Sequence, residues 1–440
     1  MKLRNVVRLV AAFTVLVSLA AACSSSSSSS SSSGSGASSS SVDANAEFAS
    51  LGGWNEPACS TTQPKVEVAI QNPIDVAGTS LKDYVDGTQA AVDAFNSRGG
   101  IDNKCIDLKT CDGKTDGPTE LACARAQVDD PTIVAGLAST YLSDEADAYK
   151  LFEDAGLAQV GAQVTLPSAW NSPVSYEFTM GGSGALLAGI PALNSIGVKK
   201  FVVFVPQSGQ VAGALASFAQ PLVDKLGMTL VEAVQIPPTA VEFTQFILAA
   251  QNAGAEGGVL ALPGNVASQM IDAADSLSSP LKLSASWGTF SDKAVADIPE
   301  SISGNMAFSD AVPPAVANSS TWPIFNVILS DFAKSGKPNL QAENVTAQAT
   351  NGWLAVYALV KVMRDAKATD ISRATVKAAF DAATNVPMFD LIPPWTPTKQ
   401  STNSIFTGIS NPNYWTGHWQ VSDKSFVVDP KQVDLLALLG

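Results

Sequence analysis

Hydrogen-bonding side chains follow two short apolar runs in the first half of the chain. Ser139 and Thr140 come after the first run, 133–135, and Gln163 and Thr165 come after the second. Apolar runs of this length are typical of buried strands, and ligands bind beyond the carboxyl ends of strands in open α/β sheets. Neutral hydroxyl and amide groups suit holding a ligand better than attacking it. The sequence therefore predicts a ligand-binding rim made of these four residues.

A secreted serine hydrolase is the alternative from the enzyme class. The segment 181–185, Gly-Gly-Ser-Gly-Ala, is similar to a nucleophile elbow, but Ala185 stands where the elbow has glycine. A Ser-His-Asp site built on Ser183 would also need His418, which is the only histidine of the chain and lies in an aromatic-rich tail. Both points count against catalysis, so we predict no enzyme and no catalytic residue.

Metal binding is also disfavoured by the residue spacing. Asp112, Lys114 and Asp116 partly match a calcium loop, but Lys114 occupies a ligand position and Cys123 stands where the closing glutamate belongs. The cysteines form no CxxC pair that would suit zinc. We therefore predict neither a metal site nor a cofactor.

Strands alternate with helices along most of the chain, which is typical of parallel sheets covered by helices on both faces. Two such series are separated by Gly181-Gly182, a predicted hinge. The predicted strands are 66–70, 106–110, 133–135, 158–161 and 176–179 in the first series and 200–205, 230–236, 259–262 and 282–285 in the second. Three further helices are predicted at 322–333, 345–366 and 373–383.

A chain of 440 residues exceeds the size at which a single core stops growing, so two domains are expected. The predicted fold class is α/β, with two doubly wound parallel-sheet (Rossmann-like) lobes joined by a multi-strand hinge. The helical block and the strand-like tail suggest that the chain returns to the first lobe and finishes on the second. The predicted first lobe is 63–182 plus 304–385, and the second is 183–303 plus 386–440.

The amino terminus indicates export. Basic residues precede the apolar stretch Leu9 to Ala22, which is too short to span a bilayer comfortably. Small residues then lead into Cys23, a pattern that resembles a bacterial lipoprotein signal, in which the cysteine is lipidated. An ordinary secretory leader with a chance cysteine is the alternative. We predict a signal peptide at 1–22, followed by the lipidated cysteine and a flexible Ser-rich tether at 23–62, which would place the protein on the outer face of the bacterial cell membrane.

Charge and cysteine content agree with an exported protein. A net charge of -14 provides no basic surface for nucleic acid. An even number of cysteines after Cys23 indicates disulfides, because the compartment is oxidising. Cys111 and Cys123 are close enough for a local bridge, which would leave Cys59 to bind Cys105. Four cysteines allow three connectivities, so the sequence does not fix this pairing.

The order of these elements resembles the solute-binding lipoproteins of branched-chain amino-acid ABC importers, which have the type I periplasmic-binding fold. The resemblance covers about 64–425 and is carried by the segments 96–101, 111–124, 135–139 and 159–165. It implies that two lobes close on a small-molecule ligand and that the partners are ABC permease subunits, with the membrane reached through the lipid anchor. A ligand sensor for a signalling partner is the alternative use of the same fold.

The family's ligand contacts map onto Ser139, Thr140, Gln163 and Thr165, whose hydroxyls and backbone amides would hold a ligand carboxylate. An aromatic position that lines the family's pocket falls on Ser80.

The second lobe departs from the family's pattern. The family's Tyr-Gly loop is replaced by Ser208-Gly209, followed by Gln210, and a tyrosine position falls near Asn265. The acidic residue that would pair with a ligand ammonium is replaced by Trp287. An ammonium buried without a carboxylate costs several kcal/mol, so a free α-amino acid is disfavoured.

Aromatic residues suggest a different kind of ligand. Trp287 and Tyr141, together with Phe290, could offer flat apolar surface. We therefore predict a hydrophobic or aromatic ligand that bears a carboxylate or an amide. A cation held over Trp287 is a further alternative. The predicted mechanism is a hinge equilibrium that the ligand shifts, with no chemical step.

Overall fold

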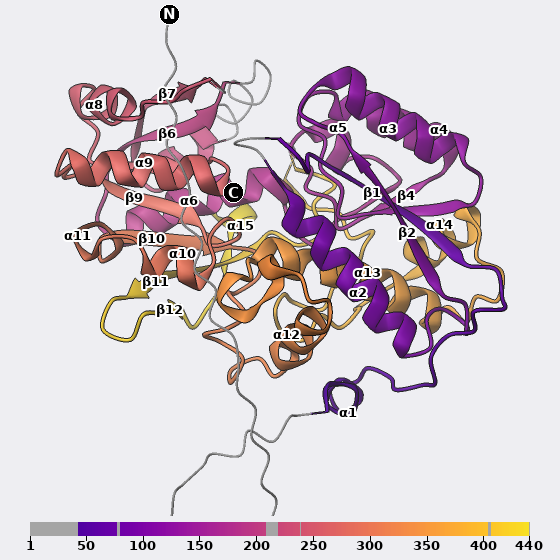
Figure 1. Ribbon diagram of the computed structural model, residues 1–440. Helices are drawn as coiled ribbons and strands as arrows, with labels where there is room; N and C mark the ends of the chain where they lie inside the picture. The colour runs from indigo at the N-terminus through magenta and orange to yellow at the C-terminus, as the bar shows by residue number, and fades with distance from the viewer. Residues whose placement is uncertain (1–42, 77–79, 208–218, 238, 404–405, 440) are drawn as a thin grey trace, which may run out of the picture. The chain divides into compact units, whose positions relative to one another are not determined.

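Two sheets organise the protein in the computed structural model, which describes residues 43–76, 80–207, 219–237, 239–403 and 406–439 (Figure 1). Both sheets belong to one compact unit, Val42–Gly440. The first sheet has the strand order β2-β1-β3-β4-β5 and is parallel throughout. Its strands are β1 (Val66–Asn72), β2 (Ile106–Asp112), β3 (Ile133–Leu137), β4 (Ala158–Val160) and β5 (Ser175–Tyr176).

The second sheet has the strand order β12-β11-β10-β9-β8-β6-β7, and β13 pairs with β11. Its parallel part consists of β6 (Lys200–Pro206), β7 (Thr229–Ile236), β8 (Gly257–Leu260), β9 (Lys282–Ser286) and β10 (Met306–Asp310). Antiparallel strands complete it, namely β11 (Asn413–Gln420), β12 (Ser425–Val428) and β13 (Val433–Asp434). The predicted fold class, two α/β lobes built on largely parallel sheets, is confirmed.

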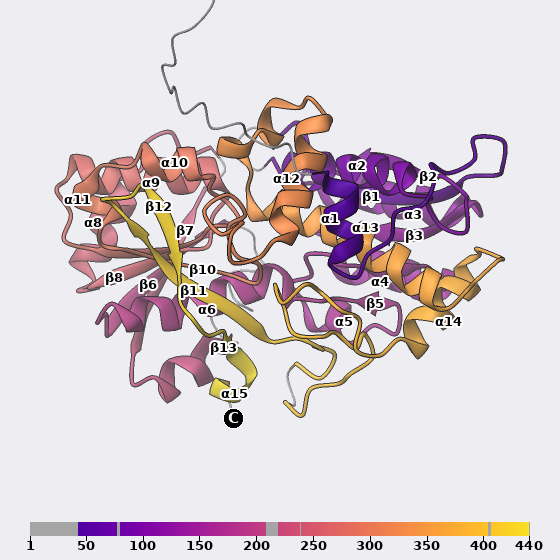
Figure 2. The same cartoon turned by 90° about the horizontal axis from the view of Figure 1, so that it is seen from below.

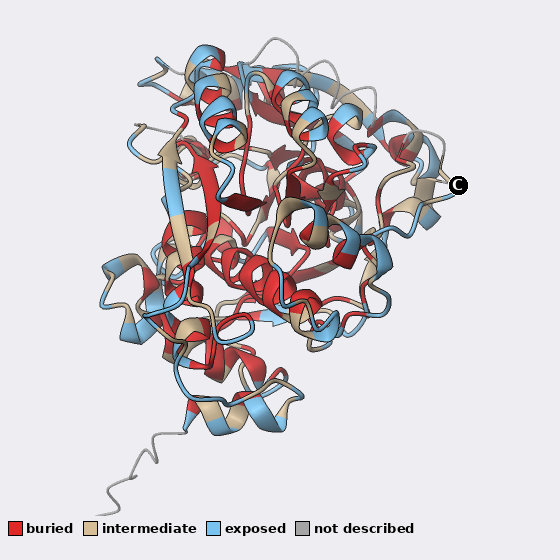
Figure 3. Ribbon diagram, turned by 90° about the vertical axis from the view of Figure 1, so that its right-hand side faces the viewer, coloured by how far each residue is buried: buried red, intermediate tan, exposed pale blue. Residues whose placement is uncertain are grey.

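Helices cover both sheets, as the alternating pattern predicts. The first lobe carries α2 (Lys82–Ser97), α3 (Gly117–Asp129), α4 (Glu145–Ala155), α5 (Pro167–Trp170), α12 (Ile324–Lys334), α13 (Ala347–Asp365) and α14 (Arg373–Ala382). The second lobe carries α6 (Gly181–Ser195), α8 (Thr244–Asn252), α9 (Gly264–Ser276), α10 (Asp292–Ala296), α11 (Glu300–Ser303) and α15 (Leu435–Leu439). Short 3₁₀ turns occur at Pro338–Leu340 and Ala342–Asn344. The buried residues lie mainly on the strands and on the helix faces turned toward them (Figure 3).

The chain leaves the second lobe later than the predicted boundary at 304. β10 pairs with β9 and β11 and therefore belongs to the second sheet. Its apolar start, Met306-Ala307-Phe308, is fully buried, as a central strand requires. The passage toward the first lobe follows Asp310, and α12 is the first helix beyond it.

The segment that enters the first lobe is ordered, in contrast to the tether predicted up to residue 62. Helix α1 (Ala44–Ser50) begins at Asp43, whose carboxylate accepts hydrogen bonds from the N–H groups of Asn45 and Ala46. Phe48 is buried among aromatic rings, 5.7 Å from Phe95 between centroids. Figure 2 shows α1 beside α12. Burial of Phe48 and Ala44, with Leu51 and Trp54 packed against the same core, holds this segment on the lobe.

A buried ion pair joins α12 to the end of α2. Arg98 donates two hydrogen bonds to Asp331, at 2.8 and 2.7 Å, and both side chains are fully buried. Trp353 of α13 donates its indole N–H to the same carboxylate at 3.1 Å. Because all the charged atoms have partners, the pair fixes how these helices meet.

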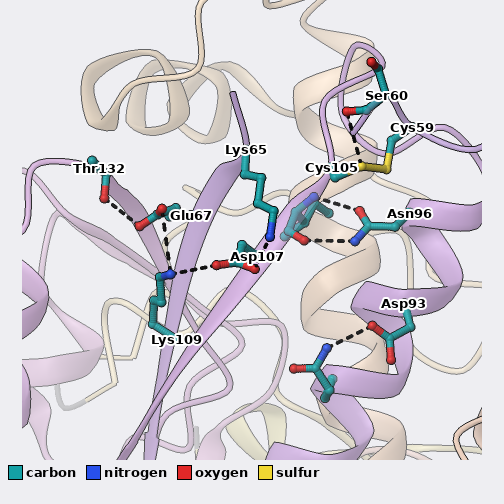
Figure 4. Close-up of polar contacts among 12 residues, drawn as sticks. Cys59, Ser60, Lys65, Glu67, Asp93, Asn96, Cys105, Asp107, Lys109 and Thr132 are labelled. Carbon is teal, nitrogen blue, oxygen red and sulfur yellow. Dashed lines mark hydrogen bonds and ion pairs between the residues drawn. A yellow bond between two sulfur atoms is a disulfide. The ribbon is translucent and has the colours of Figure 1, made fainter. Parts of the chain in front are cut away.

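The edge of the first sheet is charged and cross-linked (Figure 4). Lys65 and Lys109 donate to Asp107 on the edge strand β2, at 2.9 and 2.7 Å. Charged residues of this kind discourage pairing with another chain. The disulfide Cys59–Cys105 lies next to this strand. A second disulfide joins Cys111 to Cys123, so the favoured one of the three possible connectivities is confirmed.

Candidate functional site

A cavity of about 230 Å³ lies where the carboxyl ends of both sheets meet. The first lobe contributes Thr140, Gln163 and Thr165, which follow β3 and β4. The second lobe contributes the segment 259–263 at the end of β8, together with residues at the ends of β6, β9 and β10. Carboxyl ends of parallel strands are the usual place for ligands in such sheets, so this cavity is the candidate binding site.

Two hydrogen-bond donors on the first-lobe rim have no partner in the protein. They are the hydroxyl of Thr140 and the side-chain amide nitrogen of Gln163, and both atoms are buried. The backbone fixes their positions, because Thr140 N–H donates to Gln71 C=O at 3.0 Å and Gln163 N–H donates to Ser139 C=O at 2.9 Å. Buried polar groups are rarely left unpaired, so both donors have hydrogen-bonding capacity that the protein does not use.

Thr165 lines the cavity, and its hydroxyl already has a hydrogen-bond partner within the protein. This hydroxyl donates to the Glu145 carboxylate at 3.1 Å, and the N–H groups of Thr165 and Leu166 donate to it at 2.9 and 2.6 Å. Burial raises the pKa of Glu145 to about 8, although these donors act in the opposite direction. Glu145 therefore stabilises the loop that contains Thr165.

The second-lobe wall is largely apolar. The segment 259–263, Val-Leu-Ala-Leu-Pro, lines the cavity together with Ala285 and Ala311. Its main charged group is Asp310 at the end of β10, which sequence reasoning missed. The signal that could have found it is an acidic residue directly after the apolar run 306–308, the same kind of signal that indicated the first-lobe rim.

Asp310 already has hydrogen-bond donors from its own lobe. Its carboxylate accepts from the hydroxyl of Ser286 and from Ala311 N–H at 2.6 Å, while Gly288 N–H donates to the Ser286 hydroxyl at 2.9 Å. Burial nevertheless raises the pKa of this carboxyl above its ordinary value. A carboxylate offers about four acceptor sites, so part of the capacity of Asp310 is already used within its own lobe.

Helices α2 and α13 place further polar groups at the cavity, also missed from the sequence. The two helices cross at contact distance because Gly87 faces Ala349 and Gly352 faces Tyr84, where an added Cβ would lie 2.3 and 2.6 Å from backbone oxygens. This crossing brings Tyr84 and Asn351 to the cavity wall. The carbonyl oxygen of the Asn351 side chain is buried and has no partner in the protein.

Tyr84 and Tyr414 are the phenols of the site. Burial raises the pKa of each well above its ordinary value, with Asp310 adding to the effect. Tyr414 comes from β11 and donates its hydroxyl to the carbonyl of Gly181 at 3.3 Å. Both phenols therefore remain neutral at physiological pH.

The other predicted site residues have different surroundings. The Ser139 hydroxyl accepts from Gln71 N–H at 3.1 Å and is buried beside the rim. Ser80 is exposed and donates to Ile74 C=O at 2.6 Å, whereas its neighbour Leu81 lines the cavity. Ser208 and Gln210 lie outside the described residues.

The predicted aromatic surface belongs to the core. Trp287 is fully buried and donates its indole N–H to Val312 C=O at 2.6 Å, while Ser286 and Gly288 on either side of it line the cavity. Tyr141 is 1% exposed and packs on Phe152 at 5.6 Å between ring centroids. These side chains do not line the cavity, and Asn265 is exposed on α9.

The two residues of the hydrolase alternative have structural surroundings. Ser183 is buried in α6 and donates its hydroxyl to Thr165 C=O at 3.0 Å. His418 is exposed on β11. In this described part of the chain no hydrogen bond joins the two side chains.

Two α/β sheets that present their carboxyl ends to one cavity define a two-lobed binding protein. A family model described as periplasmic binding protein matches residues 75–405, and the chain belongs to this family. The family consists of extracytoplasmic solute-binding proteins and not of enzymes, so the hydrolase alternative is excluded. Comparison with curated protein sequences gives no match.

Solved structures agree on the fold. A fatty acid ABC transporter substrate-binding protein from Thermomonospora curvata is similar with a TM-score of 0.68 at 14% identity, over 87% of this chain and 95% of that one. A possible leucine/isoleucine/valine-binding protein from Rhodopirellula baltica gives 0.67 at 13%, over 86% and 100%. The branched-chain amino acid transporter substrate-binding protein LivJ from Streptococcus pneumoniae, in complex with isoleucine, gives 0.61 at 13%, over 84% and 99%. The predicted type I periplasmic-binding fold is confirmed. No helix in the described part of the chain is both long and apolar enough to cross a membrane.

Proposed function

We propose that this protein is the solute receptor of an ABC importer and that its lobes close on a small, largely apolar molecule bearing a carboxylate or an amide. The observation that carries this proposal is the pair of unpartnered donors, the Thr140 hydroxyl and the Gln163 amide, at the cavity. A ligand oxygen that accepts from both would satisfy them. Membership of the periplasmic binding protein family supports the receptor role.

The size and lining of the cavity support a small apolar body for the ligand. About 230 Å³ is less than the volume of sites for drug-sized ligands, which measure roughly 300 Å³ or more. The apolar surface comes from the segment 259–263 and not from Trp287, whose indole lies in the core. The aromatic rings that line the cavity are those of Tyr84 and Tyr414, and the segment 259–263 adds aliphatic contacts.

A free α-amino acid is disfavoured for a reason other than the one the sequence offers. An acidic residue, Asp310, does line the second-lobe wall. Ser286 and Ala311 N–H already donate to it, so an ammonium would compete with existing hydrogen bonds. Burying the ammonium without such a partner costs several kcal/mol.

The rim can be tested with a thermal-shift screen of amino acids, amides and aliphatic or aromatic acids, followed by calorimetric titration of the compounds that stabilise the protein. We expect Thr140→Val and Gln163→Leu each to weaken the best ligand about fivefold to tenfold, since each removes one hydrogen bond of about 1 kcal/mol. Thr110→Val, at an exposed position on β2, is the matched control and should leave affinity unchanged. Strong stabilisation by leucine or valine would reject the proposed ligand class.

The place of action is tested separately. We propose that Cys23 is lipidated and that the tract 24–42 links the membrane to the described lobes. Cys23→Ala should then release the protein from the membrane fraction while leaving ligand affinity unchanged. Uptake of the labelled ligand by cells, lost on deletion of the permease, would support transport; a ligand response without uptake would instead indicate a sensor.

A further inference from the structure

Resting on the proposed receptor function, we propose that the ligand's polar group is an uncharged carboxamide. In this arrangement the amide oxygen accepts from Thr140 and Gln163, and the amide N–H donates to the side-chain oxygen of Asn351. These groups supply two donors and one acceptor that are buried, line one cavity and lack partners in the protein. A carboxamide offers both an acceptor and a donor on one plane.

The donors of the first-lobe rim could bind either a carboxamide or a carboxylate. The charged groups that line the cavity disfavour the carboxylate. Among the described residues that line the cavity, none is lysine, arginine or histidine. The ionisable groups there are two neutral phenols and Asp310. A ligand carboxylate would therefore be buried near another acidic group with no cation to balance it, which is costly.

Asn351 adds a second argument against an anion. Its unpartnered atom is a carbonyl oxygen, which can only accept a hydrogen bond. A carboxylate has no proton to donate and would face this oxygen with a lone pair. Helix packing holds Asn351 in place, because Gly352 and Gly87 bring α13 and α2 to contact distance.

The experiment compares four probes with the same branched chain: 4-methylpentanamide, its N,N-dimethyl derivative, 4-methylpentanoate and 4-methylpentan-1-ol. Titration calorimetry at pH 7 on the wild-type chain measures their affinities. We expect the primary amide to bind about tenfold more tightly than each of the other three, because each of the three loses a hydrogen bond or introduces an unbalanced charge.

Variants at position 351 separate recognition from folding. Asn351→Leu should remove the tenfold preference for the amide over its dimethyl derivative. Asn351→Asp keeps an acceptor at this place and should retain that preference. Thermal melting of each variant checks that it folds; if Asn351→Leu is unfolded, the retained preference of Asn351→Asp and its stronger rejection of 4-methylpentanoate provide the test.

The outcomes test the amide proposal separately from the proposed receptor function. Tightest binding by the carboxylate or the alcohol, or an amide preference that survives in Asn351→Leu, would overturn the amide and leave the receptor function in place. Tight binding of a compound without an amide from the wider screen would do the same. Failure of every probe and every compound of the wider screen to bind would reject both proposals.

Discussion

The two lobes line the cavity with different chemical groups. The first lobe presents donors that lack partners, on Thr140 and Gln163, whereas the second presents apolar surface and one carboxylate, Asp310, whose donors all come from its own lobe. The first-lobe rim therefore has hydrogen-bonding capacity that the protein does not use, whereas the carboxylate of the second-lobe wall already has donors. We infer that polar recognition belongs to the first lobe and shape selection to the second.

Covalent cross-links mark a second difference, since both disulfides lie in the first lobe. Removing Cys59–Cys105, which spans 46 residues, should lower the free energy of unfolding by about 4 kcal/mol, and removing Cys111–Cys123, which spans 12, by about 3 kcal/mol. Hydrogen exchange of paired Cys→Ala variants measures this. Faster exchange confined to the first sheet is expected; equal loss of protection in both sheets would show that the lobes unfold as one unit.

Glu145 accepts hydrogen bonds from the loop that contains Thr165, and replacing it should have the next largest effect on stability. Glu145→Ala leaves the N–H groups of Thr165 and Leu166 without their acceptor, which should cost about 2 to 3 kcal/mol of stability. Glu153→Ala, at an exposed position of the same helix, should change stability by less than about 0.5 kcal/mol. Urea denaturation compares the two, and equal midpoints would refute the supporting role.

The pH dependence of stability provides a separate test of Glu145. Its pKa is about 8 in the folded protein against an ordinary value of 4.5, so between these values the folded state holds a proton that the unfolded state has lost. Stability contributed by this group is therefore present at low pH and falls as pH rises from about 5 to 8. Glu145→Gln should reduce the fall of melting temperature with rising pH. If the slope of melting temperature against pH is unchanged, other buried acids cause the fall.

The smallest effect is expected on the second-lobe wall. Ser286→Ala removes one donor from Asp310, which keeps its backbone donors, so stability should fall by about 1 kcal/mol. Ligand affinity should change less than about threefold, compared with fivefold to tenfold for Thr140→Val. A loss of affinity as large as that of Thr140→Val would show that the wall also takes part in polar recognition.

Residues that directly follow a recognisable strand can be located from the sequence. Thr140, Gln163 and Thr165 follow apolar runs, and the structure places all three at the cavity. Asp310 follows such a run too, but the short strand before it was overlooked among the helices predicted nearby. Tyr84 and Asn351 gave no local signal, because they lie within helices that are distant in sequence and meet only by packing.

Trp287 shows why residue type alone misleads. Its position at the end of a strand suggested a stacking surface, but its indole points into the core and donates to Val312 C=O. Trp287 lies in the turn that follows β9, and its side chain is buried in the core of the second lobe. The neighbours Ser286 and Gly288, and not Trp287, line the cavity.

The sequence by itself determined the α/β class and the two lobes, and it predicted that polar residues follow β3 and β4. These features depend on local periodicity and on residues close to one another in the chain. Only the tertiary structure decided which side chains face the cavity and which already have partners. That depends on helix crossings and strand register, which bring together Thr140, Asp310 and Asn351 from segments far apart in the sequence.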